Sequence, residues 1–454
     1  MLSNISHKLK LIDKNSKIDD NLYFCIMLAE PIIVSKEFHE VLDQMEYSNT
    51  NLFVTGRAGT GKSTLLNLFR RTTKKKFVIL APTGIAALNV QGQTIHSFFG
   101  FPPRIVPFHE LKKRKNHKLY KNIEVMIIDE ISMVRADMMD AIDVFLRNNR
   151  ENDVPFGGIQ IIFFGDLFQL PPVVSSAEEK QYLENNYNSV YFFDAFALKN
   201  VDYQLVELRK VYRQDERHFV RLLDAIRLNR MDEDDLMDLN EVYQPNFEME
   251  DFYITLSPRN NLVDKINQLS LSQLEGEIYS YTANVFGQFN PSQFPTDLMI
   301  QLKIGAQVMM IRNDPDKKFV NGTLGIIKDI EDDIIKVAVE FNGSKNIIDV
   351  TKTTWEVIQY KIDEENPKKI NSEIIGSFSQ YPIKLAWAIT IHKSQGKTFE
   401  KVVIDMGQGA FEHGQTYVAL SRCKTLKGIV LKQPLRARDV IVDDKIVTYF
   451  LNKR

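Results

Sequence analysis

A phosphate-binding pattern, G-x-x-x-x-G-K-[ST], is matched at every fixed position by residues 56–64. In such a loop the glycines let backbone N–H groups turn inward around the phosphates of a nucleotide, and the following helix adds the positive end of its dipole. We expect Lys62 to reach the β- and γ-phosphates and Ser63 to hold Mg²⁺ through its hydroxyl group. The predicted cofactors are therefore ATP and Mg²⁺. The rest of the predicted cradle is Gly56, Gly59, Thr60, Gly61 and Thr64.

Two acidic residues, Asp129 and Glu130, directly follow the apolar run 125–128. At the C-terminal end of a buried strand, Asp129 can bind Mg²⁺ through water, and Glu130 can orient or deprotonate an attacking water molecule. An Asp-Glu pair is weak evidence by itself, but the phosphate loop gives it a partner. Together they predict hydrolysis of a nucleoside triphosphate.

Three further polar side chains are candidates to contact the γ-phosphate. Gln169 follows the apolar run 160–164, where a γ-phosphate sensor would lie, although it could also be an ordinary loop amide. Arg213 and Arg422 are candidates to reach the γ-phosphate from a second α/β domain, because a planar guanidinium binds phosphate through two parallel hydrogen bonds. A lone arginine is more often part of a surface ion pair, and the residues alone leave that alternative open.

Hydroxyl groups and a histidine gather after the second apolar run, 77–80. They could contact the backbone of a nucleic acid, and ordinary helix capping and packing would explain them equally well. They are Thr83, Thr94, His96 and Ser97. A second cluster of charges and hydroxyls occupies residues 390–398. Between the two clusters, residues 101–122 begin with prolines and continue with lysines, which favours either a solvated face or a small insertion that meets phosphates.

The elements expected around these residues form two α/β halves. A strand at 51–55 precedes the phosphate loop and a helix follows it, and strands at 77–80, 125–128 and 160–164 alternate with helices up to about residue 195. This pattern predicts a nucleotide-binding α/β domain. A helix expected at 35–47 places Phe38, Val41, Leu42 and Met45 on one face.

The second half contains a region whose sequence pattern changes from alternating strands and helices to short strands. After a strand at 203–207, the region from about 303 to 381 consists of short alternating strands, with hairpin signals at Asn321-Gly322 and Asn342-Gly343. The α/β pattern then resumes with a strand at 401–405, a helix at 416–421 and a strand at 428–431. We therefore expect a small all-β insertion in the second α/β domain.

Composition limits the possible partners. The 454 residues carry a net charge of −2, so nucleic acid would have to be bound by a local basic groove and not by bulk positive charge. The two cysteines, Cys25 and Cys423, show no metal-ligand spacing, and no apolar run approaches the length of a membrane span. We expect a monomeric protein of the cytoplasm, associated with the nucleoid if the source is bacterial, with no membrane partner.

As an ordered set, the motifs resemble those of the Pif (petite integration frequency) family of superfamily-one 5′→3′ DNA helicases. The segments that carry the resemblance extend from residue 56 to residue 424, and residues 133–140 resemble the signature segment of the family. They are GRAGTGKST (56–64), APTGIAALNVQGQTIHSFF (81–99), IIDEISM (127–133), FFGDLFQLPPV (163–173), VYRQ (211–214), ITIHKSQGKTFE (389–400) and YVALSRCK (417–424).

The resemblance implies two RecA-like domains, with ATP between them and single-stranded DNA across their top. It places the first domain at 1–199 with a small wedge insertion at 101–122, the second at 200–302 and 382–454, and an SH3-like insertion at 303–381. It makes Arg213 and Arg422 arginine fingers from the second domain. The residues that it puts near the γ-phosphate are Gln169, Gln395 and Gly396, and its candidate contacts to DNA are Thr83, His96, Pro171, His392 and Ser394.

One residue departs from the family pattern, and two other functions stay open. The family usually has a glutamine before the phosphate loop that reads adenine, and Phe38 occupies that register here; Gln44 is another candidate reader. The expected activity is unwinding of tailed or forked duplex DNA, with roles in repair, recombination and telomere maintenance. The alternatives are a RecD-like motor of recombination or conjugation, and a nucleotide-dependent DNA-binding switch that does not unwind.

Overall fold

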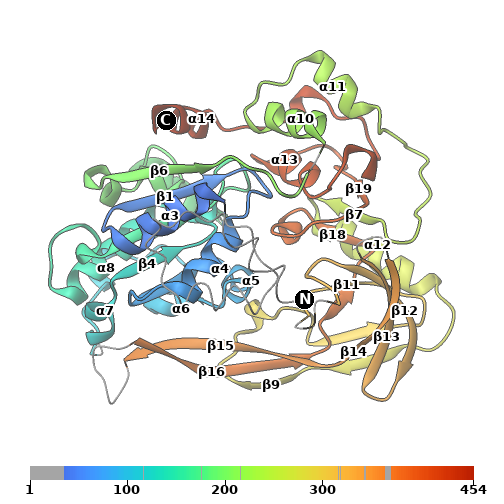
Figure 1. Ribbon diagram of the computed structural model, residues 1–454, viewed down its shortest axis with the longest axis horizontal. Coiled ribbons are helices and arrows are strands. Elements are labelled where there is room, and N and C mark those ends of the chain that lie inside the picture. The colour runs from blue at the N-terminus through green and yellow to red at the C-terminus, as the bar shows by residue number, and fades with distance from the viewer. Residues whose placement is uncertain are drawn as a thin grey trace, which may run out of the picture.

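The computed structural model describes residues 35–453 except 116, 175, 215, 315, 317, 342–343 and 363–369. Its first unit is built on a six-stranded sheet of order β3-β2-β4-β5-β1-β6, in which every neighbouring pair is parallel (Figure 1). The strands are β1 (Asn51–Gly56), β2 (Phe77–Ala81), β3 (Gln93–Thr94), β4 (Val125–Ile128), β5 (Gln160–Phe164) and β6 (Tyr203–Leu208). The four strands predicted up to residue 164 are therefore confirmed.

Helices cover both faces of this sheet, as a parallel sheet requires. Leu52 and Val54 of β1 face a cluster with α3 and α4, whereas Phe53 between them faces the larger cluster that includes α8. Helix α3 begins where the hydroxyl of Ser35 caps it by accepting from the N–H of Phe38. The helices are α3 (Lys36–Tyr47), α4 (Lys62–Thr72), α5 (Gly84–Asn89), α6 (Ile95–Phe99), α7 (Lys118–Asn122), α8 (Ala136–Arg150) and α9 (Ala177–Asn186), with short 3₁₀ turns η2 (Phe108–Glu110), η3 (Ile131–Met133), η4 (Pro155–Gly158), η5 (Phe192–Asp194) and η6 (Phe196–Asn200).

The basic stretch in residues 101–122 is partly neutralised by its own unit. Lys113 and Lys121 both form ion pairs with Glu151, at the C-terminal end of α8. The guanidinium of Arg114 donates to the carbonyl oxygen of Phe99 at 3.0 Å. These contacts attach the stretch to α6 and α8, so only part of its charge remains available to phosphates.

A second parallel sheet, of order β18-β7-β19-β20, forms the core of the other α/β unit. The two halves predicted from the sequence are therefore confirmed. The strands are β7 (Ile254–Ser257), β18 (Ala388–Thr390), β19 (Val402–Ile404) and β20 (Ile429–Leu431). The helices are α10 (Arg217–Arg227), α11 (Glu233–Asn240), α12 (Asn260–Gln273), α13 (Gln415–Leu420) and α14 (Asp444–Lys453), with 3₁₀ turns η8 (His392–Ser394), η9 (Leu426–Gly428) and η10 (Ala437–Asp439).

The predicted boundary at residue 199/200 falls before the last strand of the first sheet. Strand β6 lies beyond it, yet pairs parallel with β1 along its whole length, so the first sheet continues to Leu208. A strand at the edge of a sheet is assigned by its pairing partner, which local sequence does not reveal. The first unit therefore extends about nine residues further than expected.

Antiparallel strands form a separate β region, as predicted, but the region is larger than 303–381. It contains a five-stranded sheet β14-β13-β12-β11-β17, a three-stranded sheet β15-β16-β9 and a pair β10-β8, with 3₁₀ turn η7 (Pro291–Gln293) between strands. Strands β8, β9 and β10 come before residue 303, and β17 comes after residue 381. The bounds are β8 (Tyr279–Thr282), β9 (Asn284–Gly287), β10 (Met299–Leu302), β11 (Gln307–Met310), β12 (Leu324–Glu331), β13 (Ile334–Phe341), β14 (Ser344–Val350), β15 (Thr353–Ile362), β16 (Ile370–Gln380) and β17 (Ile383–Leu385).

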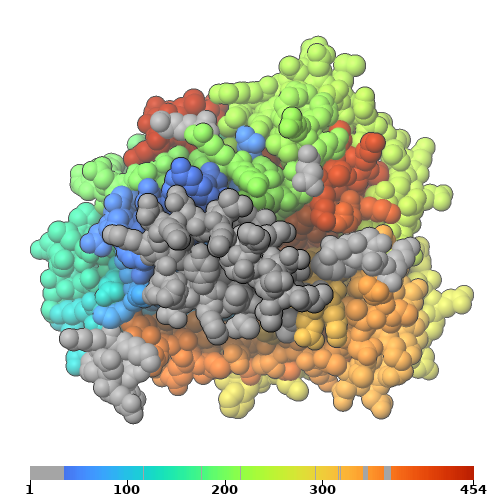
Figure 2. All heavy atoms as spheres, in the orientation of Figure 1, coloured from blue at the N-terminus to red at the C-terminus, as the bar shows by residue number. Residues whose placement is uncertain are grey.

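The β region contacts the first unit through β15. The backbone N–H of Ile79 in β2 donates to the hydroxyl of Tyr360 at 3.3 Å, and the N–H of Tyr360 donates to Gln93 Oε1 at 3.2 Å. Of the two predicted hairpin turns, Asn321-Gly322 forms a turn before β12, and Asn342-Gly343 lies outside the described residues. Figure 2 shows the first unit on the left, the β region along the lower edge and the second unit at the upper right. Among the described residues, no helix has the length and apolarity that crossing a bilayer requires.

Candidate nucleotide site between the two parallel sheets

The phosphate loop connects β1 to α4 at the C-terminal edge of the first sheet. Two of its glycines have close neighbours: a Cβ on Gly59 would lie 2.4 Å from the Cβ of Arg213, and one on Gly61 would lie 2.8 Å from Cζ of Phe38. Both glycines have left-handed backbones, with φ of +83° and +85°. Phe38 and Arg213 therefore flank the loop. Phe38, which occupies the glutamine position of the family, places an apolar ring against the backbone of the loop.

Lys62 is the first residue of α4, and its ammonium donates to the carbonyl oxygens of Gly56 at 2.6 Å and Arg57 at 3.0 Å. Burial lowers the pKa of Lys62, while the charges of Asp166 and Glu130 act to raise it. The ammonium therefore lies on the loop and within the field of two carboxylates. Of the other predicted loop residues, Thr60 is buried, whereas Ser63 and Thr64 are exposed.

Asp129 and Glu130 follow β4, and the N–H of Asp129 donates to the carbonyl oxygen of Leu80 in β2 at 2.9 Å. Glu130 has φ of +49° and ψ of +46°, a left-handed conformation that is uncommon for a non-glycine residue and is often found at functional sites. Burial, and then the charge of Glu130, raise the pKa of Asp129 to about 7. Burial also raises the pKa of Glu130, opposed by the charges of Lys62 and Arg422. The acid pair therefore faces the two basic groups predicted to bind phosphate.

One buried and one partly buried guanidinium lie beside the loop. Arg422 is 1% exposed, and its Nε donates to the carbonyl oxygen of Val418 and its Nη2 to Ser421 Oγ, both at 2.9 Å. Nη1 of Arg213 donates to the carbonyl oxygen of Ser421 at 3.1 Å. Burial lowers the pKa of Arg422 to about 10, and burial followed by the charge of Arg422 lowers that of Arg213 to about 9. Since these hydrogen bonds go to neutral oxygens, the arginines match an anion site and not the surface ion pairs that the sequence left open.

The expectation that both fingers come from the second domain is only partly met. Arg422 follows α13, which lies between β19 and β20 of the second sheet. Arg213, in contrast, follows the first-sheet strand β6, and the N–H of Tyr212 beside it donates to the carbonyl oxygen of Gly59 at 2.8 Å. Arg213 therefore lies on the connection between the two units.

The two glutamines predicted near the γ-phosphate meet across the units. Nε2 of Gln395, after η8, donates to Oε1 of Gln169 at 3.3 Å, and Gln169 itself is 6% exposed. The amide of Gln169 lies 3.5 Å from Oδ2 of Asp166. Gly396 follows with φ of +76°. This contact joins the loop after β5 to the loop after β18.

Lys397, the next residue in the chain, should make the stability of the fold depend on pH. It is 7% exposed, and its Nζ donates to Asn321 Oδ1 at 2.6 Å. Burial, and then the charge of Lys384, lower its pKa from 10.5 to about 7. Between these values the unfolded chain binds more protons at this residue than the folded chain, so stability rises with pH across this window. We predict that the melting temperature of the wild type minus that of Lys397→Met increases from pH 7 to pH 10.

Thermal denaturation at several pH values measures this difference. The hydrogen bond that Asn321 loses in the variant adds an offset without a pH slope, so the slope carries the test. Lys36→Met is the matched control, because the side chain of Lys36 is 91% exposed. A wild-type-minus-variant difference for Lys397→Met that stays constant with pH would contradict the shifted pKa.

Two of the predicted DNA contacts lie together on the first unit. Thr83 and His96 line a hollow of about 210 Å³ beside Val134 and Arg135 of the signature segment, and Val173, 55% exposed, completes one wall. Thr83 also caps α5, since its Oγ1 accepts a hydrogen bond from the N–H of Ala86. The same residue therefore caps a helix and lines the hollow. His392, from the second unit, lies 3.5 Å from Glu412.

Two other predicted contacts do not reach the surface. Ser394 is 0% exposed, and its hydroxyl donates to the carbonyl oxygen of Ile391 at 2.7 Å. Pro171 is also buried. In this arrangement neither side chain is accessible to a DNA strand, because both pack inside the units.

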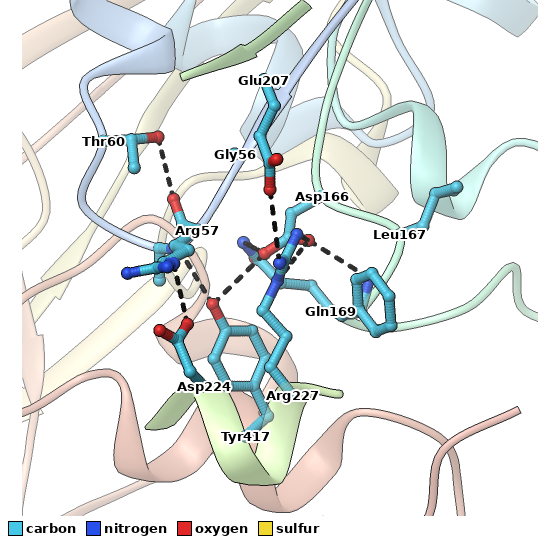
Figure 3. A network of polar contacts seen from close by, with 12 residues as sticks. Gly56, Arg57, Thr60, Asp166, Leu167, Gln169, Glu207, Asp224, Arg227 and Tyr417 are labelled. Atoms are coloured by element: carbon cyan, nitrogen blue, oxygen red, sulfur yellow. Dashed lines mark hydrogen bonds and ion pairs between the residues drawn. The ribbon is translucent and has the colours of Figure 1, made fainter. Parts of the chain in front are cut away.

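Sequence reasoning missed a buried polar group beside the loop, formed by Asp166, Arg227 and Tyr417 (Figure 3). Asp166 lies two residues after the buried strand β5, much as Asp129 follows β4, and that position was a usable signal. Arg227 lies on the amphipathic helix α10 and Tyr417 on the fully buried helix α13. Neither residue has a comparable signal, because only the packing of these helices brings them to the site.

A phosphate loop, an acid pair at the end of another strand of the same sheet, an arginine from the second unit and one from the connection between the units define a P-loop nucleoside triphosphatase whose site is completed by a second RecA-like unit. The chain belongs to the PIF1-like helicase family. The family model described as "PIF1-like helicase" matches residues 34–236, and that of the "DNA helicase Pif1, 2B domain" matches residues 289–330.

The matched relatives differ in length. The "ATP-dependent DNA helicase Pif1" of Campylobacter jejuni is 34% identical, over 82% of this chain and 86% of the relative. The "ATP-dependent DNA helicase PIF1" of Danio rerio is 34% identical over 87% of this chain, but the match spans only 60% of the fish protein. Structures of Pif1 from Bacteroides sp cover 93% of this chain and 97% of theirs, with TM-scores of 0.86 for a complex with ADP-AlF4 (38% identity) and 0.67 for a complex with single-stranded DNA (39% identity).

Proposed function

We propose that this chain is an ATP-dependent 5′→3′ DNA helicase that moves along single-stranded DNA and unwinds tailed or forked duplex. The observation that carries the proposal is the pair of guanidiniums of Arg213, partly buried, and Arg422, fully buried, which lie beside the phosphate loop and donate hydrogen bonds to neutral oxygens. An anion bound at the loop would complete their charge balance. Because Arg422 belongs to the second unit, such an anion would also draw the units together.

Each residue has a role in hydrolysis that follows from its place. Lys62 would turn from the loop carbonyls to the phosphates, and Glu130 would orient the attacking water. Arg213 and Arg422 would neutralise charge that grows on the γ-phosphoryl oxygens. The bonded glutamines, Gln169 and Gln395, would report the loss of the γ-phosphate from one unit to the other.

The donors at the site also suit Mg²⁺, which prefers oxygen ligands. Asp129 is a buried carboxylate whose pKa is raised, and Ser63 presents a hydroxyl on the first turn of α4. We assign the cation to these two residues. When bound, it would offset negative charge on the β- and γ-phosphates.

We further propose how the chain is divided and what it binds. A first RecA-like domain would extend to about residue 208, with a wedge at 101–122, and an SH3-like β insertion at about 279–385 would interrupt the second domain. Thr83, His96 and His392 would contact the DNA strand. The protein would act as a monomer in the cytoplasm, with roles in repair and recombination.

The test is displacement of a labelled strand from duplexes that carry either a 5′ or a 3′ single-stranded tail. We expect displacement only from the 5′-tailed duplex, dependent on ATP and Mg²⁺ and absent in Lys62→Ala, which removes the ammonium but keeps the loop. Displacement from the 3′-tailed duplex would overturn the polarity. Binding and ATP turnover without displacement on any tailed substrate would favour the DNA-binding switch.

Binding of the single strand should also weaken steeply as salt rises, because phosphate contacts release counterions. Fluorescence anisotropy with a tailed oligonucleotide and a blunt duplex at several salt concentrations measures this. Equal affinity for both at every concentration would count against a motor that moves along one strand.

A further inference from the structure

A single buried network of polar side chains connects the phosphate loop to both α/β units (Figure 3). Asp166 comes from the loop after β5, Arg227 from α10 and Tyr417 from α13. Oδ1 of Asp166 lies 3.0 Å from Nη2 of Arg227, and Oδ2 of Asp166 lies 3.3 Å from the hydroxyl of Tyr417. None of the roles assigned above uses these three residues.

The ion pair at the centre of the network is inaccessible to water. The side chains of Asp166 and Arg227 are 0% and 2% exposed. Arg227 also lies 3.7 Å from a carboxylate oxygen of Glu207 in β6, and its guanidinium lies 4.4 Å above the ring of Phe168. Although burial acts to raise the pKa of Asp166, the charges of Arg227 and then Lys62 hold it below the ordinary value. Asp166 is therefore a fixed, ionised acceptor, because a buried charge keeps its partner and its geometry.

Tyr417 connects this acceptor to the phosphate loop. Its hydroxyl oxygen accepts from the backbone N–H of Ala58 at 3.0 Å, which leaves its single proton to be donated to Asp166. Burial, and then the charge of Asp166, raise the pKa of Tyr417, so the phenol keeps that proton. The loop is thus held to α13 by one hydroxyl whose orientation the ion pair determines.

Helix α13 also holds Arg422 in place. Nε of Arg422 donates to the carbonyl oxygen of Val418, one residue after Tyr417, and Nη2 donates to Ser421 Oγ. The position of the guanidinium therefore depends on the backbone of α13. The contact between Tyr417 and Ala58 joins that backbone directly to the loop, beside the bonds that Arg213 and Gln214 make to the carbonyl oxygen of Ser421.

We infer that Tyr417 is a positioning residue that holds Arg422 at the phosphate loop, with the Asp166–Arg227 ion pair orienting its hydroxyl. This inference rests on the ATP hydrolysis proposed above. Through Tyr417, a movement of the second unit would reach the nucleotide site by one hydrogen bond to Ala58.

The test is a double-mutant cycle on single-turnover ATP hydrolysis. Tyr417→Phe removes only the hydroxyl, and we expect about a tenfold loss of rate with nucleotide affinity changed less than twofold. In an Arg422→Ala background, the same substitution should have no further effect on the rate, because there is no finger left to position. Tyr449→Phe is the matched control, since it removes a partly buried phenol hydroxyl that bonds the hydroxyl of Tyr203 at 2.8 Å, away from the loop.

The outcomes separate the inference from the function on which it rests. A wild type without ATP hydrolysis would overturn the proposed function. If the wild type is active, two results would overturn only the role of Tyr417. One is a Tyr417→Phe variant that hydrolyses ATP at the wild-type rate. The other is a loss of rate from Tyr417→Phe that is as large in the Arg422→Ala background as in the wild type. If Tyr417→Phe does not fold, Arg227→Lys replaces it, because the lysine keeps the charge but loses the fork that orients Asp166. It should lose rate in the same Arg422-dependent way.

Discussion

Arg422→Ala should depress ATP turnover by about 10³-fold or more while nucleotide affinity falls only a little. The guanidinium is 1% exposed and bonds only neutral oxygens of its own helix, so it is preorganised for charge that appears on the γ-phosphoryl group. Such a donor contributes most in the transition state, and its loss therefore lowers kcat more than binding. Steady-state turnover with and without single-stranded DNA, beside a nucleotide titration, measures both quantities.

Arg213→Ala should behave similarly, because its guanidinium bonds the same residue, Ser421, and lies against Gly59. Lys424→Ala is the matched control: Lys424 lies two residues after Arg422, but it is exposed and pairs with Glu400. DNA should stimulate the wild type and the control without rescuing either arginine variant. DNA-stimulated turnover near the wild-type value in Arg422→Ala would show that the site is not shared between the two units.

Glu130→Gln should lower hydrolysis by about 10²-fold and leave binding of the nucleotide with Mg²⁺ intact. The amide has nearly the same shape as the carboxylate, but it can neither accept a proton from water nor carry the negative charge that orients it. Asp129 and Ser63 remain to hold the cation. Single-turnover hydrolysis and a nucleotide titration separate the two effects.

The left-handed backbone at residue 130 calls for a specific control. Glu151 has a similar backbone, with φ of +54°, and lies on the surface where it pairs with Lys113 and Lys121. Glu151→Gln should therefore hydrolyse ATP as the wild type does. If Glu130→Gln lost nucleotide affinity in parallel with turnover, Glu130 would have a binding role and not a role in activating water.

Sequence alone was sufficient to predict the features that depend on residues close together along the chain. The phosphate loop, the strand before it and the helix after it are adjacent, so their pattern predicts their geometry. The acid pair was predictable once the phosphate loop was recognised, because apolar residues 125–128 favour a buried strand, and parallel strands end at one edge of the sheet. For the same reason the second α/β half and the β region were predicted, although their bounds were not.

Tertiary structure alone decided which distant residues share the site. Strand β6 joined the first sheet because it pairs with β1, about 150 residues earlier, and pairing over that distance leaves no local trace. Burial makes Ser394 inaccessible to a DNA strand, whereas packing of α13 brings Tyr417 to the phosphate loop. Residue types and spacing determine the chemistry that a segment can perform, but long-range packing determines which side chains water reaches and which charges meet, and the nucleotide site depends on both.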